Sequence, residues 1–171
     1  MVVKAMEGFN MYIKAFTKDL KCRCFQYEVG KTYATDKEIK LCGHGFHFCD
    51  NLDDVLLYYN AYSRYCEVIP GKHIIKGDNK YVSSSITIVR ELTFAELIDL
   101  DTTGKWCYYY AKQIPGADIE FLQAKVIEKD NDGKWCYYYA FCIPGADIEL
   151  LQAVAIKKDS FYRKPIYVNK K

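Results

Sequence analysis

The sequence has little net charge and no long apolar run. Its 24 Lys and Arg residues nearly balance 22 Asp and Glu residues, which leaves a formal charge of +2. Binding to nucleic acid regardless of sequence draws on clustered positive charge, so direct nucleic-acid binding is not expected. No stretch reaches the roughly 18 apolar residues of a membrane-spanning helix, and Lys4, Glu7 and Lys14 interrupt any secretion signal. These absences predict a cytoplasmic protein with no membrane partner.

Histidine and arginine are also scarce, and no phosphate-binding glycine loop is present. Gly43 and Gly45 lack a third glycine and precede a strand-like run rather than a helix. The eight cysteines, in a chain expected to stay inside the cell, indicate reduced thiols that pack as small hydrophobic groups. Apolar and aromatic residues make up 50% of the 171 residues, enough to bury a core without metal or disulfides.

The most specific feature is an internal repeat. Two segments recur at an offset of 29 residues: Gly104–Ala111 recurs unchanged as Gly133–Ala140, and Ile114–Ala124 recurs as Ile143–Ala153 with Leu150 in place of Phe121. The first repeat has two apolar sets at helical spacing. One consists of Trp106, Tyr109, Tyr110 and Ile114, and the other consists of Ile119, Leu122, Val126 and Ile127. Pro115-Gly116 separates them, so each repeat is predicted to be a helical hairpin. Such hairpins must stack to bury their apolar faces.

The region before the repeats has a different pattern. Short strand-like runs alternate with turns: Met11–Phe16, Phe25–Val29, Phe46–Phe48, Tyr65–Ile69, His73–Lys76 and Ser85–Glu91. One helix is predicted from about Leu52 to Tyr59, with Asp50 or Asn51 as its N-cap. Another helix-like run, Phe94–Leu100, can be capped by Thr93.

The predicted fold class is therefore α+β, with the two kinds of structure in separate regions. A small mixed α+β domain is predicted for residues 1–92. An all-α helical-hairpin region follows over residues 93–160, with repeats at 104–132 and 133–161. Residues 161–171 form a C-terminal tail that, with Phe94–Leu100, would cover the ends of the stack.

Two motifs resemble a family of bacteriophage and prophage proteins of unknown function. They are Lys14–Tyr33 (KAFTKDLKCRCFQYEVGKTY) and Lys40–Cys49 (KLCGHGFHFC), and the resemblance covers about residues 10–92. This chain has Ala15 and Cys24 where the family usually has glycine, so local turns that depend on those glycines would differ. The hairpins resemble short repeats in accessory proteins of Firmicutes and Fusobacteria.

The resemblance implies an accessory protein of phage or prophage type, which acts in the cytoplasm of a bacterial host by binding a protein. Its expected partner is a host defence nuclease or ribonucleoprotein, and inhibition of a CRISPR effector is one form this could take. On this interpretation the protein is not an enzyme and needs no cofactor.

Histidines and cysteines gather in one short segment. Cys42, His44, His47 and Cys49 supply zinc-type ligands within eight residues, but the spacing lacks the paired C-x₂₋₄-C pattern of structural zinc sites. A strand with small thiols packed beneath it is the preferred interpretation, and no metal is predicted. A cysteine nucleophile, Cys42 or Cys49 beside a histidine, lacks an orienting third group.

An enzymatic alternative comes from a second resemblance. Gly45-Phe46-His47-Phe48, followed by a helix that ends in Tyr58-Tyr59, is similar to the central segment of ADP-ribosyltransferase folds. That resemblance implies NAD held between two small sheets, with a glutamate on a later strand, Glu91 or else Glu67. The alternative catalytic set is His47, Tyr59 and Glu91. Lys14 stands where such enzymes have an arginine or histidine, which weighs against catalysis.

The repeats supply the predicted partner-binding residues. Aromatic residues are enriched at interface hot spots, and Tyr108 and Tyr137 are expected to face outward in a ladder, flanked by Lys105 and Lys134. Single-stranded nucleic acid could stack on those tyrosines as a second alternative. The acidic residues of the adjoining helices oppose it: Asp118, Glu120, Asp147 and Glu149.

Overall fold

The structure is a computed structural model that describes residues 11–163. Its contacts divide the chain into two compact units. The first unit holds the residues up to Tyr59 together with Ser63–Leu92, and the second holds Asn60–Tyr62 and the residues from Thr93 on. Strands occupy the first unit and most helices the second, so the predicted α+β class is confirmed. No helix within residues 11–163 is long and apolar enough to cross a membrane.

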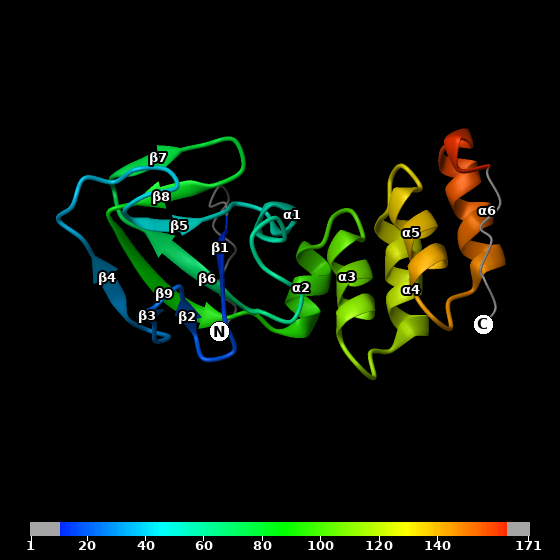
Figure 1. Ribbon diagram of the computed structural model, residues 1–171, viewed down its shortest axis with the longest axis horizontal. Helices are drawn as coiled ribbons and strands as arrows, with labels where there is room; N and C mark the ends of the chain where they lie inside the picture. The colour runs from blue at the N-terminus through cyan, green and yellow to red at the C-terminus, as the bar shows by residue number, and fades with distance from the viewer. Residues whose placement is uncertain (1–10, 164–171) are drawn as a thin grey trace, which may run out of the picture. The chain divides into compact units, whose positions relative to one another are not determined.

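The first unit contains two antiparallel sheets and a small hairpin (Figure 1). The four-stranded sheet has the order β1-β6-β9-β4, with bounds Tyr12–Phe16, Arg64–Pro70, Ser85–Glu91 and Thr32–Ala34. The three-stranded sheet has the order β5-β8-β7, with bounds Phe46–Phe48, Tyr81–Ser83 and Ile74–Lys76. The hairpin pairs β2 (Lys21–Cys22) with β3 (Phe25–Gln26). A bridge between Ile13 and Cys49 connects the two sheets.

Strand β1 is buried on both faces. Tyr12, Lys14 and Phe16 alternate with Ile13 and Ala15 along the strand, and all but Tyr12 are buried. Phe16, on one face of the strand, belongs to a buried hydrophobic core. The other buried members of this core are Leu20, Tyr27, Phe48, Cys66, Val68, Ile86 and Ile88. Lys14 therefore lies between two side chains of the aromatic core, in a position that apolar residues normally occupy.

The helix of the first unit is shorter than predicted. Helix α1 spans Leu52–Val55, and Asn51 is its N-cap because its side chain accepts the N–H of Asp54. Beyond Val55 the chain continues in hydrogen-bonded turns, in which the N–H of Tyr59 donates to the carbonyl of Val55 at 3.0 Å. Tyr58 and Tyr59 thus leave the helix in a tight turn, and both line the pocket described below.

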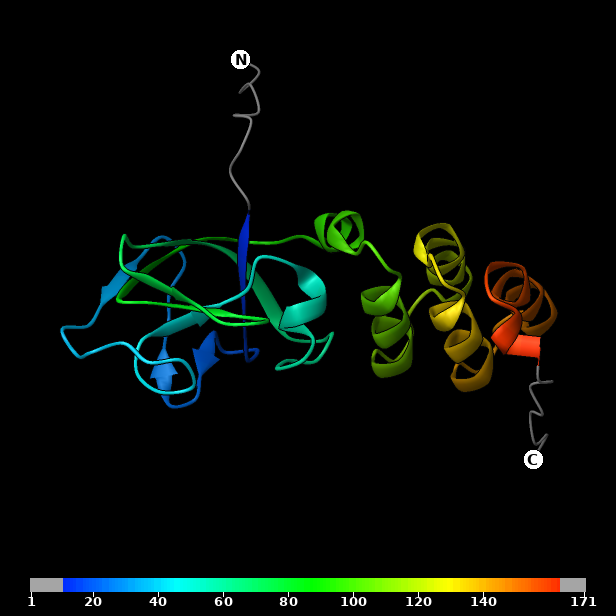
Figure 2. The same ribbon diagram turned by 90° about the horizontal axis from the view of Figure 1, so that it is seen from above.

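The second unit is a succession of helices (Figures 1 and 2). Their bounds are α2 Phe94–Leu100, α3 Lys105–Gln113, α4 Ile119–Lys129, α5 Lys134–Cys142 and α6 Ile148–Lys158, followed by a 3₁₀ turn at Ser160–Arg163. The pairs α3–α4 and α5–α6 are the two repeats. Thr93 caps α2 through a capping box with Glu96, as its position predicts.

Buried aspartates begin each hairpin. Asp101 accepts hydrogen bonds from the N–H groups of Gly104 and Cys107, and both distances are 2.9 Å. One repeat later, Asp130 accepts the N–H groups of Gly133 at 3.0 Å and Cys136 at 2.8 Å. Asp101 and Asp130 are 0% and 2% exposed. Each carboxylate thus satisfies the orphan N–H groups at the start of a helix whose cap residue, a glycine, has no side chain to do so.

The expected outward position of Tyr108 is wrong. Tyr108 is 4% exposed, and its ring packs 5.5 Å from Trp135 and 6.5 Å from Tyr139 of the next repeat. The buried face of α3 is Trp106, Cys107, Tyr108 and Ala111 rather than the predicted face with Tyr109 and Tyr110. Helix α3 buries this wider face because α5 of the next repeat packs against it.

Candidate ligand-binding pocket

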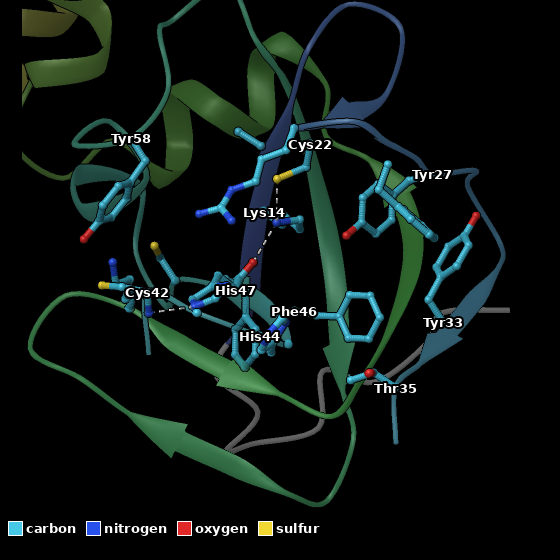
Figure 3. A pocket seen from close by; sticks show the side chains of 18 of the residues that line it. Lys14, Cys22, Tyr27, Tyr33, Thr35, Cys42, His44, Phe46, His47 and Tyr58 are labelled. Carbon is cyan, nitrogen blue, oxygen red and sulfur yellow. Dashed lines mark hydrogen bonds between the residues drawn. The ribbon is translucent and has the colours of Figure 1, made fainter. Parts of the chain in front are cut away.

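A pocket of about 990 Å³ opens in the first unit. Strands of both sheets contribute to its wall, namely β1 and β4 of the larger sheet and β5 of the smaller one. The β2–β3 hairpin, the glycine-containing loop before β5, and the turn after α1 complete it (Figure 3). This volume lies at the upper end of the range of about 300–1,000 Å³ that small-molecule sites occupy.

The charges around the pocket have one sign. Lys14, Arg23, Lys37 and Lys80 line it, and the described lining residues include no Asp or Glu. Burial lowers the pKa of His47, and repulsion from Lys14, Lys80 and Arg23 lowers it further. The pocket therefore presents a positive potential to whatever enters it.

Aromatic rings form the second chemical feature of the wall. Tyr58 lies on one side of Lys14 in Figure 3, and Tyr27, Tyr33 and Phe46 lie on the other. The Tyr27 ring contacts Tyr33 edge-on, with the two centroids 5.1 Å apart, and the ammonium of Lys80 lies 4.6 Å from the centroid of Tyr58. Flat π faces beside cations can hold a planar ring and a negative charge together.

Lys14 lies at the inner end of the pocket. It is 4% exposed, its amine donates to the carbonyl of His47 at 2.9 Å, and it lies 3.6 Å from the Sγ of Cys22. Burial lowers the pKa of Lys14, and the thiols of Cys22 and Cys49 oppose that shift only in part. The Cys22 sulfur in turn lies 3.0 Å from the hydroxyl of Tyr59. Burial raises the pKa of Tyr59, so its phenol stays protonated.

Two lining residues have a backbone conformation that is rare for their type. Arg23, in the two-residue turn of the β2–β3 hairpin, has φ 55°, and Cys42 has φ 62°. A left-handed conformation at a non-glycine residue is costly, and such residues are frequent at functional sites. Neither Ala15 nor Cys24, the two positions where the sequence departs from the expected glycine, is among the residues with positive φ.

The alternative catalytic set is not assembled. His47 and Tyr59 line the pocket, but Glu91 does not. Glu91 forms a bidentate ion pair with Arg64, at 2.9 and 2.7 Å, and this pairing lowers its pKa. The other candidate, Glu67, is paired with Arg90 at 2.8 Å. The carboxylate that a transferase of this type would need is thus absent from the described wall.

His47 is also unavailable as a general base. Its Nε2 accepts the N–H of Cys42 at 3.1 Å, which occupies the lone pair that would take up a proton. The described residues, Cys42, His44, His47 and Cys49 among them, include no group of three or more His, Cys, Asp or Glu side chains that could hold a metal ion. Cys49 is buried, donates to the carbonyl of Asn79, and has a pKa raised to about 12, so it is a structural thiol.

Tyr137, Lys105 and Lys134, which the sequence placed with Tyr108 at a partner surface, lie in the second unit. Tyr137 is half-buried, and its ring packs 5.1 Å from Tyr162 of the 3₁₀ turn. Lys134 is exposed and lies over the ring of Trp135 at 5.1 Å. Lys105 is half-buried.

Comparison with known proteins identifies the family of the first unit. A family model described as "Domain of unknown function (DUF7666)" matches residues 10–100, more than half of the chain, and the chain belongs to this family. The match spans every strand of the first unit and helix α2. No curated protein and no solved structure matches the chain.

Proposed function

We propose that the first unit binds a small anionic ligand that carries a planar ring, of the nucleotide class. The observation that carries this proposal is the pocket wall, which combines the cations Arg23, Lys37 and Lys80 and the buried amine of Lys14 with aromatic rings and, among the described residues, has no carboxylate. Protein surfaces ordinarily mix charges of both signs, so a wall of one sign favours ligands of the opposite sign.

Several features support the nucleotide class over a simple inorganic anion. The volume of about 990 Å³ is far larger than a phosphate ion requires, and most of the wall away from the cations is apolar or aromatic. Arg23 can pair with a phosphate through two N–H groups, while Lys37 and Lys80 act as point charges. Tyr27, Tyr33 or Tyr58 can stack with a base.

Titration of the full chain with a fluorescent adenine nucleotide, with ADP, ATP, GTP and NAD as competitors, tests the proposal. The informative variants are Arg23→Gln and Lys80→Gln. Each should weaken binding about tenfold or more, because a hydrogen bond to a charged group contributes about 1.5–3 kcal/mol. Lys31→Gln is the matched control, since Lys31 is exposed, pairs with Glu28 and does not line the pocket. Equal affinity in all three variants, or no binding by any of these ligands, would contradict the proposal.

A second function is favoured by one difference between the repeats. Phe141 occupies the position of Lys112 in the first repeat (112 + 29 = 141) and is 57% exposed, and Tyr138, one helical turn earlier on the same helix, is 40% exposed. Tyr138 and Phe141 together place two exposed aromatic side chains on one face of α5, and exposed apolar patches often mark sites of protein–protein contact. We propose that this part of α5 contacts a protein partner, in keeping with the phage-type accessory role expected from the sequence.

Phe141→Lys restores the first-repeat residue and is the variant of choice. If α5 contacts a partner, affinity capture from bacterial lysate with the wild-type chain should retain a nuclease-resistant protein that the variant loses. Lys157→Gln, at an exposed lysine of α6, serves as a control for altered surface charge. Equal capture by wild type and Phe141→Lys would rule out this surface.

A further inference from the structure

Lys14 is the one lysine of strand β1, and its surroundings are unusual for a charged group. Its neighbours on the same face of the strand, Tyr12 and Phe16, belong to or pack on the core, and its amine lies 5.4 Å from the centroid of the Phe16 ring. A buried ammonium normally has a carboxylate partner, since taking a charge out of water costs several kcal/mol. The described contacts of the Lys14 amine are instead a carbonyl and a thiol.

A purely structural role explains this arrangement poorly. The hydrogen bond to the His47 carbonyl ties β1 to β5, but the adjacent bridge between Ile13 and Cys49 already joins the same two strands through two backbone hydrogen bonds, at 2.8 and 2.9 Å. An apolar side chain at position 14 would avoid the cost of burial altogether. The position of the amine on the pocket wall provides a reason to keep a lysine there.

We propose that Lys14 forms an imine with the carbonyl carbon of an anionic aldehyde or ketone bound in the pocket. The nitrogen of the neutral amine forms a bond to the carbonyl carbon, and the carbonyl oxygen leaves as water with both amine hydrogens, so that a C=N bond remains. The reaction requires no oxidant, reductant or metal. This proposal rests on the proposed function, because it assumes that the cations of the same pocket hold the anionic part of the ligand.

The environment of Lys14 favours each requirement of this reaction. Only the unprotonated amine is a nucleophile, and desolvation shifts Lys14 toward that form. Arg23 repels the protonated amine further, and Arg23 and Lys80 on the same pocket wall attract the anionic group of the ligand. The protonated hydroxyl of Tyr59, linked to Lys14 through Cys22, is available to donate a hydrogen bond to the carbonyl oxygen.

Pyridoxal 5′-phosphate is a suitable probe, because it is a planar, anionic aldehyde. The full chain is incubated with a low concentration of this probe, reduced with sodium borohydride to convert any imine to a stable amine, and mapped by peptide mass spectrometry. All 20 lysines compete in the same tube. We expect Lys14 to be labelled about tenfold faster than exposed lysines such as Lys18 and Lys31, because a lowered pKa increases its unprotonated fraction. Lys14→Met should lose this fast label, and Lys31→Met should keep it.

Pyridoxal without the phosphate separates amine reactivity from anion recognition. Because its free 5′-hydroxyl adds to the aldehyde, pyridoxal is less reactive toward every lysine, so the quantity compared is the ratio of Lys14 to Lys31 labelling. This ratio should be about tenfold lower with pyridoxal than with the phosphate ester, since pyridoxal lacks the group that the cations hold. An adenine nucleotide added in excess should protect Lys14 from both probes if it occupies the same pocket.

The outcomes distinguish the imine from the proposed function. Labelling spread over exposed lysines, with Lys14 unmodified in the wild type, overturns the imine; nucleotide binding measured separately then still supports the proposed function. Fast labelling of Lys14 with no nucleotide binding and no difference between the two probes supports the reactive lysine and contradicts the anionic ligand class. Because the wild type alone gives the decisive result, the test does not depend on the folding of Lys14→Met.

Discussion

In the second unit, Asp101 and Asp130 lie one repeat apart and make matching hydrogen bonds to residues three and six positions ahead. In the first unit, the Lys14 amine donates a hydrogen bond to the backbone carbonyl of His47, which lies 33 positions further along the chain. Local contacts thus fix the helix starts of the repeats, while long-range strand pairing assembles the pocket wall. A change in the repeats should therefore alter stability and leave the chemistry of the pocket intact, whereas a change at Lys14 should alter the chemistry of the pocket.

The two repeats also differ from one another at positions where their sequences are identical. Trp106 is 1% exposed and packs against Phe94 of α2, whereas its repeat partner Trp135 is half-buried. Tyr139 is fully buried, and its counterpart Tyr110 is half-buried. Each side chain takes the environment that the neighbouring helix provides, so repetition of sequence does not produce a repeated surface. A predicted ladder of outward tyrosines fails for this reason.

The largest expected effect concerns the aspartate that begins the second hairpin. Asp130→Ala removes a buried acceptor and leaves the N–H groups of Gly133 and Cys136 without it. We expect a loss of about 4 kcal/mol in the free energy of unfolding, because charge-assisted hydrogen bonds contribute about 1.5–3 kcal/mol each. Asp118→Ala is the control, since Asp118 is an exposed N-cap whose loss costs about 1 kcal/mol. Urea denaturation measures the free energy of unfolding of both variants. Equal losses would show that the buried Asp130 stabilises the fold no more than an exposed N-cap does.

A somewhat smaller effect is expected at a glycine of the same turn. Gly133 has φ +84°, and a Cβ there would lie 2.7 Å from the carbonyl oxygen of Ala155. Gly133→Ala should cost about 3 kcal/mol, from the left-handed backbone and from the clash. Gly145 has φ +85° and open space around its Cα, so Gly145→Ala should cost about 1 kcal/mol. Thermal unfolding of the two variants compares them, and an equal change in Tm would contradict the close packing of the repeats at Gly133.

The smallest expected effect is a pH dependence that belongs to the first unit. The pKa of Lys14 is lowered in the folded chain, so between that pKa and about 10.4 the unfolded chain binds a proton that the folded chain does not. Wild-type stability, measured relative to Lys14→Met, should therefore rise with pH in this window, by at most about 1.4 kcal/mol per pH unit. Lys14 also contributes to the lowered pKa of His47, so the two proteins are compared above pH 8, where that imidazole is neutral in the folded and the unfolded chain. A difference that stays constant from pH 8 to 10 would indicate an ordinary lysine.

Sequence patterns predicted some strands closely and missed others. The bounds Phe46–Phe48 and Ser85–Glu91 agree with the structure, because apolar and β-branched residues mark these strands. The missed strand β8, Tyr81–Ser83, is central to its sheet, yet it is three residues long and borders a polar run of serines. Strand β4 was missed for a similar reason, since its three residues are ordered by pairing with β9, more than fifty positions away.

The pocket could be predicted only in part. The segment around His47 and the tyrosines after α1 were identified as a candidate site, and Lys14 was noted as standing where ADP-ribosyltransferase folds have an arginine or histidine. The sequence could not show that Arg23, Lys37 and Lys80 line the same pocket as Lys14 with no carboxylate among the described lining residues, or that Glu91 pairs with Arg64. Those facts depend on strand order and on side-chain pairing across the sheet, which local periodicity does not encode.

The central claim is that the first unit holds an anionic, planar ligand in the pocket around Lys14. Its most direct test is to record backbone amide shifts of the isotope-labelled full chain by NMR while ADP is added. Saturable shifts should concentrate at lining residues such as Arg23, Ala34 and Gly45, with those of the helices α3 to α6 unchanged. Absence of saturable shifts, or shifts confined to the repeats, would contradict the claim.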